Sequence, residues 1–576
     1  MAATLAFALL LAVWSVAVPI GDAPDETSHA DLVFHLATGA AYPRYNGRHV
    51  GAALSQLCLQ TTAATRACPR EGEVVSRTSV RPHTARNAPA RGSLRDFNEA
   101  GGDREIGPFN QMLQHPPLYY WTMSGLIRSE RFALPGSGLP PLIRELALLR
   151  LANVLLIAPL PILAWWACRR LGLADDVGVA AALVPFAVPQ LLHIGSTLNN
   201  DNLLTLLVAA LTGLLAGVVR GDLSRRTAAA VGVITGLALL TKAFALVLPI
   251  AVVFAYGLGW RRTRPRSGQR RDAAVAVAVA GVVSAGLGGW WYVRNLARGD
   301  GVSPSTENAR LNTTLRPRGF HADPWIWARR FVSLFTERFW GAFGWYTVRI
   351  SLAAVSVATV VLIGALSLGF VGIGRAPRSS PLASDDGGAG PRRVVRPVGR
   401  IDLMALLLPA ALLVVFVLVR SWSLYAKTGQ FSFIQGRYVF AAVVGIAAVA
   451  AVGAQRLMGR RAALATLGLA TIMQAEGLRR VLSGYWGPGG GGPADQVRAL
   501  VAWSPWPTEV LVLGALAFLA ATAWLGLEVA RTARRAVVLP AATSNDASAA
   551  SVADTVAAHR STGAGPSQEA VGSGSP

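Results

Sequence analysis

The first residues in the chain that could do chemistry are an acidic pair followed by a histidine, Asp25-Glu26-x-x-His29, directly after an apolar stretch. Two adjacent carboxylates at a membrane boundary are costly to desolvate, so a purely structural reason for them is less expected than on a soluble surface. If a helix runs over 25–36, Asp25 and His29 share one face, where a carboxylate can act as general base toward a hydroxyl. The alternative is helix capping by acidic residues, which Pro24 favours. The residues alone leave both interpretations open.

A second segment, 114–121, reads Gln-His-Pro-Pro-Leu-Tyr-Tyr-Trp. Pro116 and Pro117 cannot continue a helix, but they can start one. The aromatic residues 119–121 are amphipathic and suited to the headgroup level of a bilayer. We therefore expect an interfacial helix to begin here on the outer surface, whether or not it does more than anchor its loop.

Cations at the expected outer ends of apolar spans form a third candidate group. Lys242 interrupts an apolar region, and Arg294 and Arg437 lie at the ends of two others. Snorkelling to the interface is the simpler account. The alternative is a charge clamp for a phosphate group, for which arginine is geometrically suited. The turn 199–202, which contains Asp201, is explained first by turn chemistry, because Asn and Asp favour such positions.

The aromatic run 338–346 is typical of an interfacial belt, although it could also line the route of a lipid chain or stack on a sugar. The sequence contains no phosphate-binding loop of the G-x-x-x-x-G-K-[ST] type, no C-x-x-C pair and no H-E-x-x-H. These absences argue against an ATP-driven pump and a zinc protease.

Such residues need a scaffold, and the composition predicts a membrane one. The 576 residues are 52% hydrophobic and 15% charged, with the apolar residues in long blocks. Blocks of about 18 residues or more can cross a hydrocarbon core as helices. We therefore expect an all-α integral membrane protein, a polytopic bundle of about 12 transmembrane helices (11–13). The expected spans are 3–20, 145–167, 177–195, 200–219, 227–241, 243–259, 273–293, 351–373, 401–420, 437–456, 462–479 and 508–530.

The net charge of +23 comes mainly from arginines in short loops, where they set topology rather than bind nucleic acid. Placing those loops in the cytoplasm predicts a multi-pass protein of the plasma membrane with both termini inside. A signal peptide at the start is the alternative to a first helix, but the stretch lacks a basic n-region. The expected parts are a first transmembrane helix (1–20), an extracytoplasmic loop with interfacial helices (21–144), a transmembrane core (145–373) with an outer loop (294–350), a cytoplasmic linker (374–400), C-terminal transmembrane helices (401–540) and a disordered cytoplasmic tail (541–576).

Three cysteines are present. Cys58 and Cys68 fall in the long outer loop, where an oxidising exterior permits a disulfide. Two free thiols are the alternative there. Cys168, at an inner helix end, is expected to be reduced.

The order of these motifs resembles that of the GT-C superfamily of membrane glycosyltransferases. It is similar to the protein mannosyltransferase and aminoarabinose-transferase branch, and closest to the bacterial group known as domain of unknown function 2142. The likeness covers roughly residues 1–480. It rests on Pro24-Asp25-Glu26-x-x-His29, His115-Pro116-Pro117-Leu118-Tyr119-Tyr120, Asn200-Asp201, Leu240-Thr241-Lys242, Trp291-Tyr292-Val293-Arg294-Asn295, Phe339-Trp340-Gly341-x-Phe343-Gly344-Trp345 and Gln435-Gly436-Arg437-Tyr438.

The resemblance implies transfer of a sugar from a polyprenyl-phosphate carrier to an acceptor hydroxyl of a cell-envelope glycan, lipid or protein, outside the cytoplasm. Asp25 matches the catalytic base and Glu26 its neighbour. No cofactor is certain, although some such enzymes use a divalent metal. The partners implied are the lipid-linked donor, membrane lipids and the acceptor. The chain departs from the mannosyltransferases in its expected span count and in lacking a recognisable C-terminal outer domain. The residues implied to bind substrate are His29, His115, Pro116, Tyr119, Asp201, Lys242, Arg294 and Arg437.

Two other classes compete with this interpretation. A transporter or flippase of lipid-linked saccharide predicts charges within the spans and repeated halves. A non-catalytic membrane scaffold predicts that function survives removal of Asp25. Few mid-span charges and no obvious repeat are present, so the transferase is preferred.

Overall fold

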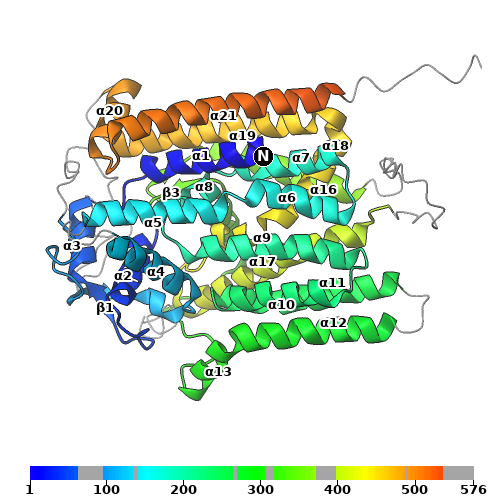
Figure 1. Ribbon diagram of the computed structural model, residues 1–576, viewed down its shortest axis with the longest axis horizontal. Helices are drawn as coiled ribbons and strands as arrows, with labels where there is room; N and C mark the ends of the chain where they lie inside the picture. Colours follow the sequence, from blue (N-terminus) through cyan, green and yellow to red (C-terminus); the bar gives the residue numbers. More distant parts are fainter. Residues whose placement is uncertain are drawn as a thin grey trace, which may run out of the picture.

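The long helices lie side by side and run along one common direction, as the computed structural model shows (Figure 1). Smaller elements gather at one end of this bundle, among them α2, α4 and α13. Because Asp25 lies there, we call it the Asp25 end. The structure describes residues 1–61, 95–133, 140–263, 269–305, 317–371, 397–487 and 491–535.

Within these described ranges, eight helical segments are long and apolar enough to cross a membrane, or nine if one bent pair counts as a span. The chain is therefore a mostly helical multi-pass membrane protein, while the expected count of about 12 stays a prediction. Helix α1 (Ala2–Ala17) is apolar but shorter. The eight segments are Leu142–Leu171, Asn200–Val219, Ala243–Arg262, Arg271–Ala297, Leu352–Val371, Arg400–Thr428, Gly436–Trp486 and Thr508–Arg534.

The expected span 177–195 is broken by proline. Helix α7 and the short turn η2 are followed by α8, and the axis bends by 73° between them. Pro185 and Pro189 lie within this region, and proline lacks the amide proton that would continue the helical ladder. The three elements are α7 (Asp175–Leu183), η2 (Val184–Ala187) and α8 (Pro189–Gly195).

The apolar region around Lys242 is also broken. Helix α10 (Arg225–Leu239) ends before it, and η3 (Ala243–Val247) and α11 (Leu248–Arg262) follow it. Lys242 itself is extended, with φ of −158°. The cation therefore lies in the turn between two helices rather than within one.

The first long loop forms a small layer over the Asp25 end. Its two strands, β1 and β2, pair antiparallel, with His49 opposite Phe109. Helix α4 (Leu118–Ala133) begins directly after the two prolines, as their position predicts. Tyr119 and Tyr120 are fully buried between α2 and the bundle, so they do not face lipid headgroups as expected, whereas Trp121 is exposed.

The remaining elements complete the bundle and its connections. Their bounds are α2 (Glu26–Ala37), β1 (His49–Gly51), α3 (Ala52–Thr61), β2 (Glu105–Phe109), η1 (Gln111–Gln114), α5 (Leu142–Ile157), α6 (Leu160–Leu171), α9 (Asn200–Val219), α12 (Gln269–Ser284), η4 (Ala285–Gly289), α13 (Trp290–Ala297), α15 (Pro324–Trp340), β3 (Ala342–Phe343), β4 (Val348–Arg349), α16 (Leu352–Val371), α17 (Arg400–Thr428), η5 (Gly436–Ala442), α18 (Val443–Met458), η6 (Gly459–Arg461), α19 (Ala462–Val481), η7 (Leu482–Trp486), α20 (Pro493–Trp503) and α21 (Thr508–Arg535).

The remaining sequence predictions concern the cysteines, the linker and the C-terminal tail. Cys58 is in a disulfide and Cys168 is free and buried, whereas Cys68 lies outside the described residues. Nearly all of the linker 374–400, and the whole tail 541–576, also lie outside them.

Helix α18 is buried by its neighbours over most of its length, and its small residues let those neighbours approach closely. A Cβ on Gly453 would collide with the carbonyl oxygen of Ala365 in α16, and one on Gly445 with that of Leu406 in α17. Close approach of this kind is how helices pack in lipid, where burial of apolar surface gives little driving force.

We expect Gly453→Ala to lower the melting temperature of the protein in detergent. Overpacking of a tight contact costs about 1–3 kcal/mol. The matched control is Gly468→Ala in α19, where a Cβ meets open space. Because alanine is the better helix former, that change should be neutral or stabilising. Equal melting temperatures for the two variants would contradict the packing.

Candidate active site

Asp25 is held by side chains from two distant parts of the chain. Gln111 donates from Nε2 to its Oδ1 at 2.7 Å, and Arg437 donates from Nη2 to its Oδ2 at 2.8 Å. Asp25 occupies the N-cap position of α2, yet its side chain makes no cap hydrogen bond. The acidic pair therefore stands at the start of a helix, as the capping alternative predicts, but the half-buried Asp25 carboxylate does not cap it and instead contacts Gln111 and Arg437.

Backbone strain is concentrated around this site. Four described non-glycine residues have positive φ, and two of them, Asn46 and Asp25, are of types that adopt it most readily. The other two are the aromatic residues Tyr346 and Phe433, with φ of 65° and 63°. Tyr346 donates to the Gln435 side chain at 2.7 Å, two residues before Arg437. Strained residues persist where the surrounding structure fixes them, and they cluster at functional sites.

Two cations lie beside Asp25. Arg437 is 4% exposed, and its Nε and Nη1 have no hydrogen-bond partner in the described structure. Lys242 donates to Asp201 at 2.5 Å and to Asn200 at 3.3 Å, and burial lowers the pKa of its ammonium while Asp201 opposes that shift. Both cations flank the ring of Tyr438, at 5.3 and 5.8 Å. The unused guanidinium donors make this a place for an anion.

Two histidines complete the same site. The Nδ1 of His29 is 3.0 Å from the Tyr120 hydroxyl, and the two rings stack at 5.8 Å. Burial, reinforced by the charges of Lys242 and Arg437, lowers the pKa of both His29 and His115 well below its usual value. Both imidazoles are therefore neutral at physiological pH.

The proline loop and the asparagine turn are tied to the site by hydrogen bonds. The amide of Leu118, after Pro116 and Pro117, donates to the carbonyl of Leu240 at 3.0 Å. Tyr119 donates to Asn153 at 3.0 Å. In the asparagine turn, Asn199 caps α9 through the Asp201 amide, as turn chemistry predicts, while the Asp201 side chain goes to Lys242.

Glu26 is separated from Asp25 in its contacts. Its carboxylate pairs with Arg150 at 2.6 and 2.7 Å, and it also accepts from the amides of Gly21 and Leu198. Arg150 donates further to three carbonyls at the end of α1, those of Ser15, Val18 and Pro19. Glu26 is 2% exposed and fully partnered. It holds the loop between α1 and α2 in place and is not available as a base, contrary to the expectation for this pair.

Arg294 is also placed differently from the expectation. Its guanidinium lies 4.5 Å over the ring of Trp291 in α13. Among the described residues, no hydrogen bond or ion pair joins it to Asp25, Lys242 or Arg437. The expected convergence of cations therefore includes two of the three.

Sequence reasoning missed two residues of this region, Gln111 and Arg150. Neither stands in a recognisable motif. Arg150 lies in an apolar helix, where a charged residue is unusual, and this is the signal that could have found it. In the described part of the chain, no group of three or more His, Cys, Asp or Glu side chains could hold a metal ion.

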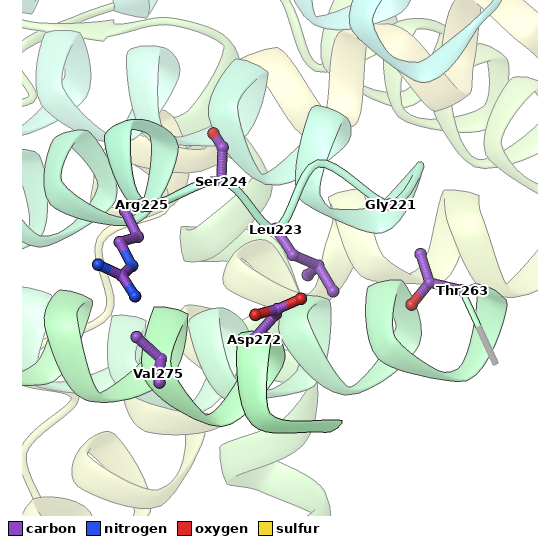
Figure 2. A pocket seen from close by; sticks show the side chains of 7 residues that line it. All are labelled: Gly221, Leu223, Ser224, Arg225, Thr263, Asp272 and Val275. Carbon is purple, nitrogen blue, oxygen red and sulfur yellow. The ribbon is translucent and has the colours of Figure 1, made fainter. Parts of the chain in front are cut away.

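A hollow of about 320 Å³ lies away from these residues (Figure 2). The helix ends that form it lie at the end of the bundle opposite the Asp25 end (Figure 1). It sits where the connection before α10 meets the end of α11 and the start of α12. Arg225 and Asp272 face it from two helices. Its lining contains none of the residues around Asp25.

Comparison with known proteins identifies the family. Residues 7–446 match the family model described as predicted membrane protein, DUF2142. The chain belongs to the DUF2142 family. No curated protein matches the sequence.

Two crystal structures of ArnT from Cupriavidus metallidurans are similar to this DUF2142 protein. The apo structure has a TM-score of 0.39 at 16% identity, and covers 73% of this chain and 64% of its own. The structure bound to undecaprenyl phosphate has a TM-score of 0.44 at 15% identity, and covers 92% of this chain and 74% of its own. The chain thus spans about two thirds of the apo ArnT chain.

We expect Glu26→Gln to destabilise the protein strongly. Removing one partner of a buried pair costs about 3–5 kcal/mol, because the other charge stays buried. The control is Glu528→Gln, which removes the partner of Arg531 from an exposed pair on α21 and should cost about 0–1 kcal/mol. Thermal melting of both variants measures the difference. A Glu26→Gln variant as stable as the control would contradict the structural role.

A second carboxyl of the same loop predicts a pH effect. Burial raises the pKa of Asp22 to about 7, opposed by the nearby Tyr485 hydroxyl and raised further by Glu26. The folded state then holds its proton more tightly than the unfolded one, so stability falls as pH rises from about 4 to about 7. We expect Asp22→Asn to flatten the melting temperature across this range, with Asp323→Asn as control. An unchanged slope would contradict the burial.

Proposed function

We propose that this protein is a glycosyltransferase that moves a sugar from a polyprenyl-phosphate carrier to an acceptor hydroxyl. The observation that carries the proposal is the site itself. The Asp25 carboxylate does not cap its helix and is paired with Arg437, beside Lys242. A base and an anion site at one place are what this reaction needs. The donor class follows from the GT-C resemblance of the motifs, and the family itself is one of membrane proteins.

The reaction is a displacement at the anomeric carbon. Asp25 takes the proton of the acceptor hydroxyl, and the oxygen forms a bond to that carbon as the bond to the phosphate oxygen breaks. The electron pair of the broken bond leaves on the lipid phosphate. Arg437 and Lys242 stabilise the negative charge that develops there.

Arg437 links the two halves of this reaction. Its Nη2 holds the Asp25 carboxylate, while Nε and Nη1 have no partner among the described residues and are free to donate to phosphate oxygens. A guanidinium has donors enough to do both, in a fixed plane. We infer that donor binding supplies the missing acceptors and leaves Asp25 oriented toward the acceptor hydroxyl.

The neutral histidines suit the acceptor side. An uncharged imidazole can accept or donate a hydrogen bond to a hydroxyl without competing with the phosphate for the cations. His29, fixed by Tyr120, is the residue we expect to touch the acceptor. The arginine-rich loops at the other end favour the cytoplasm for that side, which supports an extracytoplasmic location for Asp25.

The test is transfer of label from a panel of radiolabelled polyprenyl-phosphate sugars to a cell-envelope extract by purified protein in lipid. We expect Asp25→Asn to lower the rate by at least about 100-fold, the lower range for losing a general base. The control is Asp323→Asn, which also changes an N-cap aspartate, but one whose side chain does cap its helix. Asparagine caps as well as aspartate, so this control should keep its activity.

Three outcomes would contradict parts of the proposal. Transfer that survives in a folded Asp25→Asn variant would remove Asp25 as the base. Movement of intact lipid-linked sugar across vesicles, without transfer, would replace the transferase with a flippase. Failure of every donor in the panel, with the wild type folded, would reject a polyprenyl-phosphate sugar as donor.

A further inference from the structure

Three arginines at the Asp25 end, Arg44, Arg294 and Arg298, lie outside the site described above. The charges of Arg44 and Arg298 both act on the Arg294 guanidinium, and Asp300 is the acidic residue that opposes them there. In the part of the chain that the structure describes, none of the three forms an ion pair. We call them the arginine patch. Like charges held together repel each other, and an anion relieves that repulsion.

The arginine patch is built onto aromatic residues rather than spread over a mobile surface. Arg294 stacks over Trp291 at 4.5 Å, and Tyr42 meets the same ring edge-on at 5.5 Å. Stacking of a guanidinium on an aromatic face orients its donors while leaving them unused. Arg294 is partly exposed, and Arg44 and Arg298 are exposed, so these donors are open to a ligand.

Tyr42 connects this patch with the residues around Asp25. Its hydroxyl donates to the carbonyl of His115 at 2.8 Å. Its ring also contacts Tyr120 at 6.3 Å, and Tyr120 is the partner of His29. The patch therefore lies along a continuous series of aromatic contacts that begins where the acceptor hydroxyl is expected.

On helix α13, the arginines lie on a different side from the exposed apolar residues. Val293 and Leu296 are 66% and 55% exposed, which is typical of a face turned to the bilayer. At about 100° per residue, Arg294 and Arg298 lie on a different edge of the helix, between that face and the buried one. Snorkelling to the headgroups explains single arginines at such a place. It does not explain why three converge next to Tyr42.

We propose that the arginine patch is an acceptor subsite that binds the anionic groups of an acidic glycan, one bearing carboxylate or phosphate. This proposal rests on the proposed function, because only a transferase has an acceptor. An extended chain held there would pass Tyr42 and present a hydroxyl to His29 and Asp25. The protein would thus select acidic acceptors over neutral ones of the same length.

The test measures binding, not transfer. Wild-type protein in nanodiscs of zwitterionic lipid is titrated with a fluorescent oligogalacturonide and with a neutral maltooligosaccharide of equal length, at low and at physiological salt. The patch variant carries Arg294→Gln and Arg298→Gln. The matched control carries Arg329→Gln and Arg330→Gln, which remove the same charge from exposed positions on α15.

We expect wild type to bind the acidic probe at least about tenfold more tightly than the neutral one, more so at low salt. The patch variant should lose that preference, and the control should keep it within about twofold. Equal binding of both probes by wild type, or equal loss in patch variant and control, would overturn the proposal. Unchanged probe binding by the patch variant, with lower affinity of the detergent-solubilised protein for phosphatidylglycerol vesicles, would make the occupant a membrane lipid and overturn it too.

Failure of this proposal is distinguishable from failure of the proposed function. Selective binding without transfer from any donor would reject the transferase and leave an acidic-glycan site. Transfer with no selectivity for acidic probes would reject the subsite alone.

Discussion

The whole Asp25 end depends on how its buried charges are compensated. An ion that leaves water for an apolar bundle is stable only when it is paired and hydrogen-bonded. Glu26 and Arg150 meet this condition fully, since the carboxylate accepts four hydrogen bonds and the guanidinium also reaches three carbonyls at the end of α1. This pair fixes the chain that leaves α1, and therefore fixes where Asp25 lies.

Asp25 and Arg437 meet the same condition only in part. The carboxylate is satisfied, but two donors of the guanidinium are buried without a described partner. An unsatisfied buried donor costs about 1–3 kcal/mol, so a fold retains it where something outside the chain completes it. The strained backbone of Tyr346 and Phe433 nearby also indicates a functional site, because packing elsewhere must offset its cost. Full compensation at Glu26 and incomplete compensation at Arg437 distinguish a structural ion pair from a binding site.

The cations of this end divide into two groups by their surroundings. Lys242 and Arg437 are buried beside carboxylates, where their electrostatic interaction with a charge that develops during transfer is strong because water is excluded. Arg294 is partly exposed over an aromatic ring, where its field reaches solvent. The first setting suits stabilisation of a charge that develops during a reaction, and the second suits recognition of a charge already present on a ligand.

The sequence by itself determined the membrane class, the separate apolar segments on either side of Lys242 and the start of α4 after Pro117, whereas the bend within the expected span 177–195 was not predicted. These follow from apolar length and backbone chemistry, which are local properties. Only the tertiary structure decided that Asp25 pairs with Arg437, that Glu26 turns away to Arg150, and that Arg294 stays apart. Neighbours at a helix start point about 100° apart, so adjacent carboxylates find different partners. Which partners they find depends on packing between segments more than 100 residues apart, and no local pattern records it.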